Sequence, residues 1–211
     1  MSQAAIRMQK FGGGTFIIAG ILLLAANLFL VVVPPPPTTQ AGFVQWLTAN
    51  KFPMFMANEV LFFATILLVP SFIALGKLLE MGSKVSTFAG MSIVALALPL
   101  LTMLIVAQGR LVDPVFNVDL SVDTLKLAFS IFYGGLHAVL LMVGAALFFI
   151  SFAMRKTVFH PGMVPMGYVT GLLQIAGAYP WLTPVAFNVL VPVSLALWMV
   201  LTGTMILRRT P

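Results

Sequence analysis

Six long apolar segments, separated by short connections, constrain this chain more than any other feature of its sequence. A helix needs about 20 apolar residues to cross the ~30 Å hydrocarbon core of a bilayer, because each residue adds about 1.5 Å. Only 8% of the 211 residues are charged, whereas water-soluble domains carry about 25%. So few charged side chains cannot cover a surface exposed to water. The sequence therefore predicts an all-α integral membrane bundle with six transmembrane helices.

The predicted spans form a single transmembrane domain over residues 1–211. They cover about residues 14–33, 53–76, 88–109, 127–154, 163–182 and 184–207. The proline run from Pro34 to Pro37 ends the first span, because proline cannot continue an α-helix, and Pro99 is expected to bend the third. The first span is too long for the apolar core of a signal peptide, about 7–15 residues, so we expect it to be retained.

The distribution of basic residues orients these spans, since Lys and Arg favour cytoplasmic connections. With the N-terminus inside, eight basic residues lie in the cytoplasmic connections: Arg7, Lys10, Lys77, Lys84, Arg155, Lys156, Arg208 and Arg209. The outer connections then hold three, Lys51, Arg110 and Lys126. This bias predicts that both termini are cytoplasmic. It also explains the net charge of +6 without a nucleic-acid partner, so the expected environment is the lipid bilayer.

Two outer connections are long enough to have structure of their own. Thr38 and Thr39 are suited to cap a short helix that runs to Asn50. Phe43, Trp46 and Leu47 share one face of that helix, which predicts that it lies in the membrane interface. The connection over 111–126 alternates apolar and polar residues, which is typical of either a short extended lid or the entrance to the next span.

Polar residues inside the predicted spans are costly in lipid, so each one needs a reason. They are Asn27, Asn58, Glu59, Tyr133, His137, Gln174 and Asn188. At ~1.5 Å per residue they lie in the outer half of the membrane or, for His137, near its midplane. One hypothesis is an outward-opening polar cavity, centred on Glu59 and His137, that binds a ligand. In the alternative, the amides only join helices, Glu59 faces water or pairs with Lys51, and His137 is satisfied in the core.

Several kinds of site are excluded or disfavoured by counting. The absence of cysteine excludes disulfides, thiolate metal sites and a thiol nucleophile. One Glu and one His at matching depth are too few for zinc. His160 falls in a cytoplasmic connection, away from His137, which disfavours a haem bound by two histidines of this chain. No nucleophile elbow, H-E-x-x-H or phosphate-loop pattern occurs. We therefore expect no cofactor, no metal and no catalytic residue.

Two glycine patterns bear on helix packing. Gly167 and Gly171 have the small-xxx-small spacing that permits close approach of two helices. The run Phe11-Gly12-Gly13-Gly14 lacks the Lys-Ser/Thr of a phosphate loop, and it indicates a flexible entry into the membrane.

The second half of the chain resembles a known family. The matching text comprises Phe132-Tyr133-Gly134-Gly135-Leu136-His137, Arg155-Lys156-Thr157-Val158-Phe159, Pro165-Met166-Gly167 and Leu172-Leu173-Gln174-Ile175-Ala176-Gly177. These segments resemble the DUF4386-type family of small bacterial six-span membrane proteins of unknown function. The chain departs from the family pattern at Met166, near which a basic residue is expected. The resemblance implies a multi-pass protein of the bacterial cytoplasmic membrane and assigns no reaction.

Three functions are compatible with these features. The favoured one is a non-enzymatic protein that binds a small polar or amphipathic ligand, or that acts as an accessory subunit or homo-oligomer in a membrane complex. The second is a proton-coupled small-molecule transporter with Glu59 and His137 as relay groups. The least favoured is a membrane enzyme acting on lipids or quinones, with His137 as base and Tyr133 or Glu59 assisting.

Overall fold

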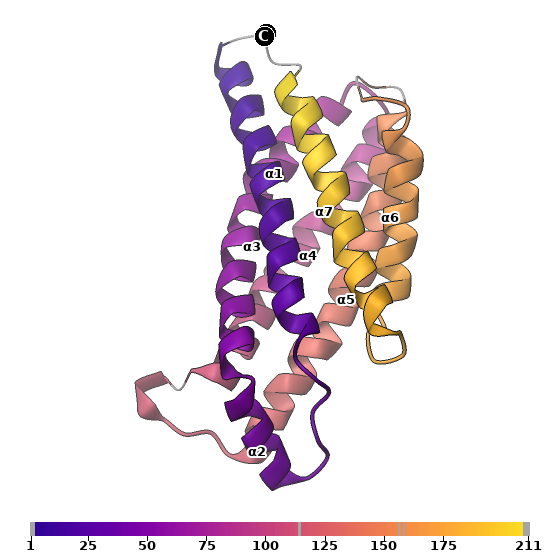
Figure 1. Ribbon diagram of the computed structural model, residues 1–211. Coiled ribbons are helices and arrows are strands. Elements are labelled where there is room, and N and C mark those ends of the chain that lie inside the picture. The colour runs from indigo at the N-terminus through magenta and orange to yellow at the C-terminus, as the bar shows by residue number, and fades with distance from the viewer. Residues whose placement is uncertain (1–2, 114, 156, 158, 209–211) are drawn as a thin grey trace.

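The chain folds into one helical bundle (Figure 1). The computed structural model describes residues 3–113, 115–155, 157 and 159–208. Within them the elements are α1 (Gln3–Val31), α2 (Gln40–Ala49), α3 (Lys51–Leu79), α4 (Lys84–Val112), the 3-10 turn η1 (Val115–Asn117), α5 (Val122–Met154), α6 (Met163–Gly177) and α7 (Val185–Arg208). The predicted all-α fold class is confirmed.

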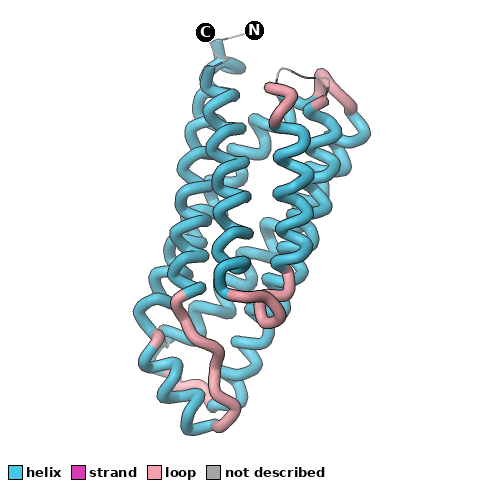
Figure 2. The backbone as a smooth tube through the Cα atoms, turned by 45° about the vertical axis from the view of Figure 1, so that its right-hand side comes forward, coloured by secondary structure: helices cyan, strands magenta, loops and turns pink. Residues whose placement is uncertain are grey.

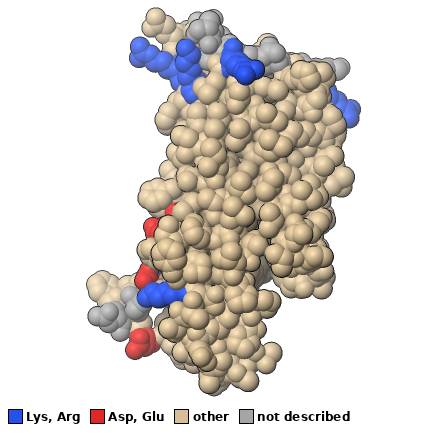
Figure 3. Space-filling model, viewed as in Figure 1, with Lys and Arg blue, Asp and Glu red and all other residues tan. Residues whose placement is uncertain are grey.

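Five of these helices are long and apolar enough to cross a membrane: α1, counted from Ile6, and α3, α4, α5 and α7. Large apolar side chains such as Phe62, Phe63 and Ile66 are exposed along their outer faces. In water such a surface would be strongly unfavourable, whereas lipid solvates it. On the face shown in Figure 3, Lys and Arg gather at the upper end and acidic side chains lie lower, along one flank. The protein is therefore a multi-pass integral membrane protein.

The span predicted over 163–182 is shorter in the structure. α6 ends at Gly177, and its 15 residues extend about 22 Å, less than the ~30 Å of the hydrocarbon core. The reason lies in the residues that follow. Pro180 has no N–H to donate to a helical carbonyl and restricts the backbone of Tyr179, so the helix stops before this pair. The length that the sequence predicted was therefore wrong for this segment.

The six longer helices form a closed ring in the order α1, α3, α4, α5, α6, α7. α1 packs extensively against both α3 and α7, and α5 packs extensively against both α4 and α6. The α3–α4 and α6–α7 interfaces are less extensive. The bundle thus consists of two halves, α1–α3–α7 and α4–α5–α6. We call the two interfaces that join these halves, α3–α4 and α6–α7, seams. Figure 2 shows the helices lying nearly parallel.

Glycines bring helices close together inside each half. Gly12 and Gly13 lie within α1, so the prediction of a flexible entry was wrong. A Cβ on Gly203 of α7 would come 2.6 Å from the Gly13 carbonyl oxygen, closer than two such atoms approach. In the other half, a Cβ on Gly171 would lie 3.0 Å from the Gly144 carbonyl oxygen. This contact confirms that the Gly167–Gly171 spacing permits close packing of α6 on α5.

The predicted short helix after the proline run is confirmed as α2. The Thr39 hydroxyl accepts a hydrogen bond from the Gly42 amide at 3.3 Å and caps the helix. Its apolar face, with Phe43, Trp46 and Leu47 buried, packs against the N-terminal ends of α3 and α5. These side chains therefore contact protein, and the position of α2 in the membrane interface stays a prediction.

The connection over 111–126 takes one of its two predicted forms, the entrance to the next helix. Val122 onward belongs to α5, so the second part is the entrance to that helix. The first part holds η1, in which Phe116 has a left-handed backbone (φ 54°) and a side chain that is 94% exposed. The described residues of this connection contain no strand.

Candidate functional site

His137 anchors the turn between α6 and α7. Its Nδ1 lies 2.8 Å from the carbonyl oxygen of Ala178, at the end of α6. Because a carbonyl only accepts, Nδ1 is the donor in this bond. The imidazole packs edge-on against Tyr179, with ring centroids 4.6 Å apart, and lies 6.1 Å from the ring of Trp181. These contacts give His137 a structural role in joining α5 to the turn.

Asn188 closes the same turn from the first part of α7. Its side-chain oxygen accepts a hydrogen bond of 2.6 Å from the Thr183 hydroxyl. Its amide nitrogen donates to the Pro180 carbonyl at 3.0 Å. Both polar ends of this side chain are therefore used inside the α6–α7 connection, as expected for an amide that stabilises local structure.

Gln174 and Asn27 also bond to backbone carbonyls. Gln174 is 1% exposed, and its amide nitrogen donates to the Val191 carbonyl at 3.1 Å across the α6–α7 seam. Asn27 donates to the Leu23 carbonyl at 2.8 Å within its own helix. Gln174 therefore joins two helices, as the alternative interpretation of the amides expects, whereas Asn27 does not.

Tyr133 belongs to a cluster of aromatic rings that joins α5 to α2. Its ring lies 4.5 Å from that of Phe129 and 5.2 Å from that of Phe132. Phe129 in turn contacts Phe43 and Trp46 of α2, with centroid distances of 6.0 and 5.5 Å. The cluster fastens α2 to α5.

Glu59 lies at the edge of the α3 face that points away from the bundle. It is half-buried, and Phe62, Phe63 and Ile66, three, four and seven positions further on, are exposed. Residues at these spacings share one face of a helix. Lys51, the predicted partner of Glu59, lies 3.8 Å from Asp113 instead. Within the described residues Glu59 has no ion pair or hydrogen bond, so none joins it to His137.

Asn58 points the other way, into the seam between α3 and α4. It is 9% exposed, and its side-chain oxygen has no hydrogen-bond partner among the described residues. Its amide nitrogen would lie 3.5 Å from a Cβ on Gly109 of α4, so the side chain fits against that glycine. Asn58 is therefore a buried amide with one unused acceptor.

Gln108, which the sequence analysis missed, lies beside Asn58. It is fully buried, and its amide nitrogen donates to the Met54 carbonyl at 3.3 Å across the α3–α4 seam. Met54 is one helical turn from Asn58, so both amides enter the same stretch of the seam. The Gln108 side-chain oxygen has no partner in the described part of the chain. Two unused amide acceptors thus lie buried in one interface, where each costs about 1–3 kcal/mol if left unpaired.

A second set of unpartnered polar atoms belongs to α5 and α7. Ser151 Oγ, Trp198 Nε1 and Thr202 Oγ1 are buried and lack partners among the described residues. Ser151 on α5 and Trp198 on α7 both face Gly167 of α6, where a side chain would contact them. The sequence signal for this site was the Gly167–Gly171 pattern, which was interpreted only as helix packing.

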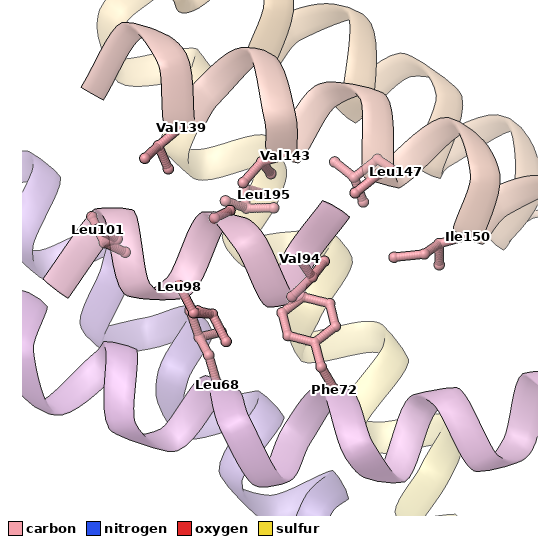
Figure 4. A pocket seen from close by; sticks show the side chains of 12 residues that line it. Leu68, Phe72, Val94, Leu98, Leu101, Val139, Val143, Leu147, Ile150 and Leu195 are labelled. Carbon is pink, nitrogen blue, oxygen red and sulfur yellow. The ribbon is translucent and has the colours of Figure 1, made fainter. Parts of the chain in front are cut away.

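The centre of the bundle holds an apolar cavity of about 50 Å³. Figure 4 shows side chains of α3, α4, α5 and α7 around it. Its lining is entirely apolar, and consists of Leu68, Phe72, Val94, Ala97, Leu98, Leu101, Val139, Val143, Ala146, Leu147, Ile150 and Leu195. Ligand pockets usually enclose about 300–1,000 Å³, and an apolar void of this size is expected to be dry. It is not the polar cavity that the sequence predicted.

The predicted site residues therefore divide into separate groups. His137, Gln174 and Asn188 support the α6–α7 side, Asn58 lies in the α3–α4 seam, and Tyr133, Glu59 and Asn27 have other surroundings. A single cavity built from all seven stays a prediction. Comparison of the chain with family models, with curated proteins and with solved structures finds no match.

Proposed function

We propose that this is a non-enzymatic protein of the bacterial cytoplasmic membrane that binds a small amphipathic ligand between α3 and α4, in the outer half of the bilayer. The observation that supports it is the pair of buried acceptors, Asn58 Oδ1 and Gln108 Oε1, without partners in the described structure. Buried polar groups in proteins are nearly always hydrogen-bonded. A bound molecule that donates hydrogen bonds would satisfy both oxygens.

The surroundings indicate the chemistry of this ligand. Apolar side chains flank the two amides, with Leu61, Leu104 and Ile105 buried nearby on the same helices. No described carboxylate or cation bonds to either amide. The ligand is therefore a small amphipathic molecule whose polar end carries a hydroxyl, amine or amide N–H. The α3–α4 interface is also one of the two less extensive ones in the ring, so it separates at lower cost than the interfaces inside each half.

The proposal includes six membrane crossings with both termini cytoplasmic, and membership of the DUF4386-type family suggested by residues 132–177. Basic residues of α1, α3, α4 and α7 support the orientation, since Arg7, Lys77, Lys84 and Arg208 lie near helix ends that share one end of the bundle (Figure 1). α5 ends at that end and α7 returns to it, so α6 must cross in the opposite direction. A short helix crosses where the bilayer thins or where interfacial aromatics such as Tyr179 and Trp181 extend it.

Native mass spectrometry of the protein released gently from its own membrane tests the ligand. We expect a retained small molecule in the wild type, and at least a tenfold loss of its occupancy in Gln108→Met or Asn58→Leu, because each removes an acceptor of the bound donor. Gln174→Met is the matched control, since Gln174 bonds a carbonyl across the other seam. Equal retention in Gln108→Met and Gln174→Met would contradict the site. Release of partner subunits with an empty seam would instead favour the accessory-subunit function.

A transporter is the second candidate, and the division into two halves favours it. In many transporters, one bundle rocks against another around a site between them. Here the α3–α4 and α6–α7 seams are the less extensive interfaces, and each is crossed by one buried glutamine, Gln108 or Gln174. Uptake into proteoliposomes of the molecule identified by mass spectrometry would support this function. Uptake that equals the rate in protein-free liposomes, with or without a pH gradient, would exclude it.

A further inference from the structure

An aromatic groove lies between α4, α5 and α6, at the end of the bundle where the basic residues gather. Its lining consists of Ser86, Phe148, Phe149, Phe152 and Tyr168. The groove is open to its surroundings and has a volume of about 350 Å³, so an occupant lies along it and is not enclosed by it. Phe149 and Phe152 are 42% and 47% exposed, so one wall of the groove faces the lipid.

Arg155 lies over this groove. Its guanidinium carbon is 4.8 Å from the centroid of Phe152 and 5.5 Å from that of Tyr168. Two aromatic rings, one on α5 and one on α6, thus hold the cation by cation–π contacts. The Tyr168 ring is itself 5.6 Å from that of Phe148, so the aromatic wall is continuous. Arg155 is exposed and has no acidic partner among the described residues.

The first turn of α4 completes the polar edge of the groove. Ser83 caps this helix by accepting a hydrogen bond from the Ser86 amide at 3.4 Å, and Ser86 lines the groove. The N-terminal end of a helix carries a partial positive charge and favours anions. Lys84 begins the same turn. A guanidinium, a hydroxyl and a helix N-terminus therefore adjoin one apolar groove at one end of the membrane-spanning bundle.

We propose that this groove binds one anionic phospholipid of the cytoplasmic leaflet. The phosphate lies against the Arg155 guanidinium and near the Ser86 hydroxyl, and an acyl chain lies along Phe149 and Phe152. Charge complementarity selects the occupant, because basic pockets between transmembrane helices at this depth bind anionic headgroups, and arginine pairs with phosphate through two parallel hydrogen bonds. The site rests on the cytoplasmic placement of this end, and not on the ligand of the α3–α4 seam.

Lipid competition measured by native mass spectrometry tests this site. The protein is exchanged into detergent micelles that contain equal amounts of phosphatidylglycerol and phosphatidylcholine with the same acyl chains. We expect one phosphatidylglycerol to be retained in preference to phosphatidylcholine. Arg155→Gln should lower this preference about fivefold or more, because it removes the guanidinium that contacts the phosphate directly.

Matched variants separate this site from general attraction of anionic lipids. Arg208→Gln removes one exposed positive charge at the same end of the bundle and should leave the preference unchanged. Tyr168→Phe keeps the ring under the guanidinium and should also preserve it, whereas Tyr168→Leu should reduce it. If Arg155→Gln does not fold, Tyr168→Leu carries the test. The proposal is overturned if Arg155→Gln or Tyr168→Leu binds as the wild type does, or if Arg208→Gln loses as much as Arg155→Gln.

Discussion

Buried hydroxyl and amide groups in this bundle bond mainly to backbone carbonyls. Thr65, Ser71 and Thr204 each donate to the carbonyl four residues earlier, at 2.7, 2.6 and 2.7 Å. Such bonds satisfy a polar side chain inside its own helix, so these residues need no ligand and no partner helix. Against that background the unused oxygens of Asn58 and Gln108 stand out, because their neighbours on the same helices have their hydrogen bonds satisfied.

At the scale of single residues, we predict that His137 stabilises the fold. His137→Phe keeps an aromatic ring against Tyr179 and loses the hydrogen bond to the Ala178 carbonyl. The free energy of unfolding should fall by about 1 kcal/mol, the usual net value of such a bond. Asn27→Leu is the control, because the Asn27 bond stays within its own helix. Thermal unfolding in detergent measures both, and an unchanged midpoint for His137→Phe would refute a structural role.

The sequence identifies the polar residues of the spans but not the directions in which they point. Asn58 and Glu59 are neighbours in the chain, and successive residues are about 100° apart around a helix. Asn58 therefore faces the α3–α4 seam, whereas Glu59 lies at the edge of the α3 face that points away from the bundle. Without knowledge of which helices adjoin, a face cannot be assigned. Gln108 was missed for a simpler reason: it lies next to the end predicted for its span, at residue 109, where a polar residue needs no explanation.

At the scale of the elements, glycine sets the spacing between neighbouring helices. Without a strong hydrophobic driving force between helices in lipid, close contact of backbones contributes much of their association. The α1–α7 contact at Gly13 and Gly203 and the α5–α6 contact at Gly144 and Gly171 both have this form. Each lies inside one half of the bundle, and neither crosses a seam.

This arrangement predicts that Gly203→Ala destabilises the protein. The added Cβ would come 2.6 Å from the Gly13 carbonyl oxygen, a backbone atom that moves only if α1 and α7 separate. We expect a loss of about 1–3 kcal/mol, as for other overpacked sites. Gly14→Ala is the control, since a Cβ there has no heavy atom within 4 Å, and its better helix propensity should leave stability equal or higher. Reversible unfolding in mixed micelles compares them, and equal stability of the two variants would contradict the packing argument.

The apolar runs predicted well which segments form long helices, and predicted less well where those helices begin and end. α1 begins at Gln3 and not at residue 14, and α5 begins at Val122 and not at residue 127. Hydropathy marks the part of a helix that lies in lipid, whereas the helix itself continues until a cap or a proline ends it. The capping residues Ser83 and Ser121 begin α4 and α5 in this way, outside the apolar windows.

At the scale of the whole molecule, the two halves and their seams determine where the central cavity and the unused polar atoms lie. The central cavity lies between α3 and α7 of one half and α4 and α5 of the other. No pattern in the sequence predicted the apolar lining of this cavity, because the lining depends on which helices meet at the centre of the bundle. Unused polar atoms occur beside both seams, with Asn58 and Gln108 at the α3–α4 seam and Ser151 and Trp198 near Gly167 at the α6–α7 seam.

The orientation in the membrane is testable directly, because the chain has no cysteine. Met81 and Leu182 are each 74% exposed and lie in the α3–α4 and α6–α7 connections. With a membrane-impermeant maleimide on intact cells, we expect Leu182→Cys to be labelled. Met81→Cys should be labelled only after the membrane is permeabilised. Protection of Leu182→Cys in intact cells would mean that α6 does not cross, and labelling of Met81→Cys there would reverse the orientation.

The central claim is that the α3–α4 seam binds a ligand through two amide oxygens. An experimental density map of the protein in nanodiscs prepared from its own membrane tests it most directly. The account predicts density for a bound molecule within hydrogen-bonding distance, about 2.7–3.2 Å, of both Asn58 Oδ1 and Gln108 Oε1. The contradictory result is a closed seam in which the two amides bond to each other or to the backbone, with no density between α3 and α4.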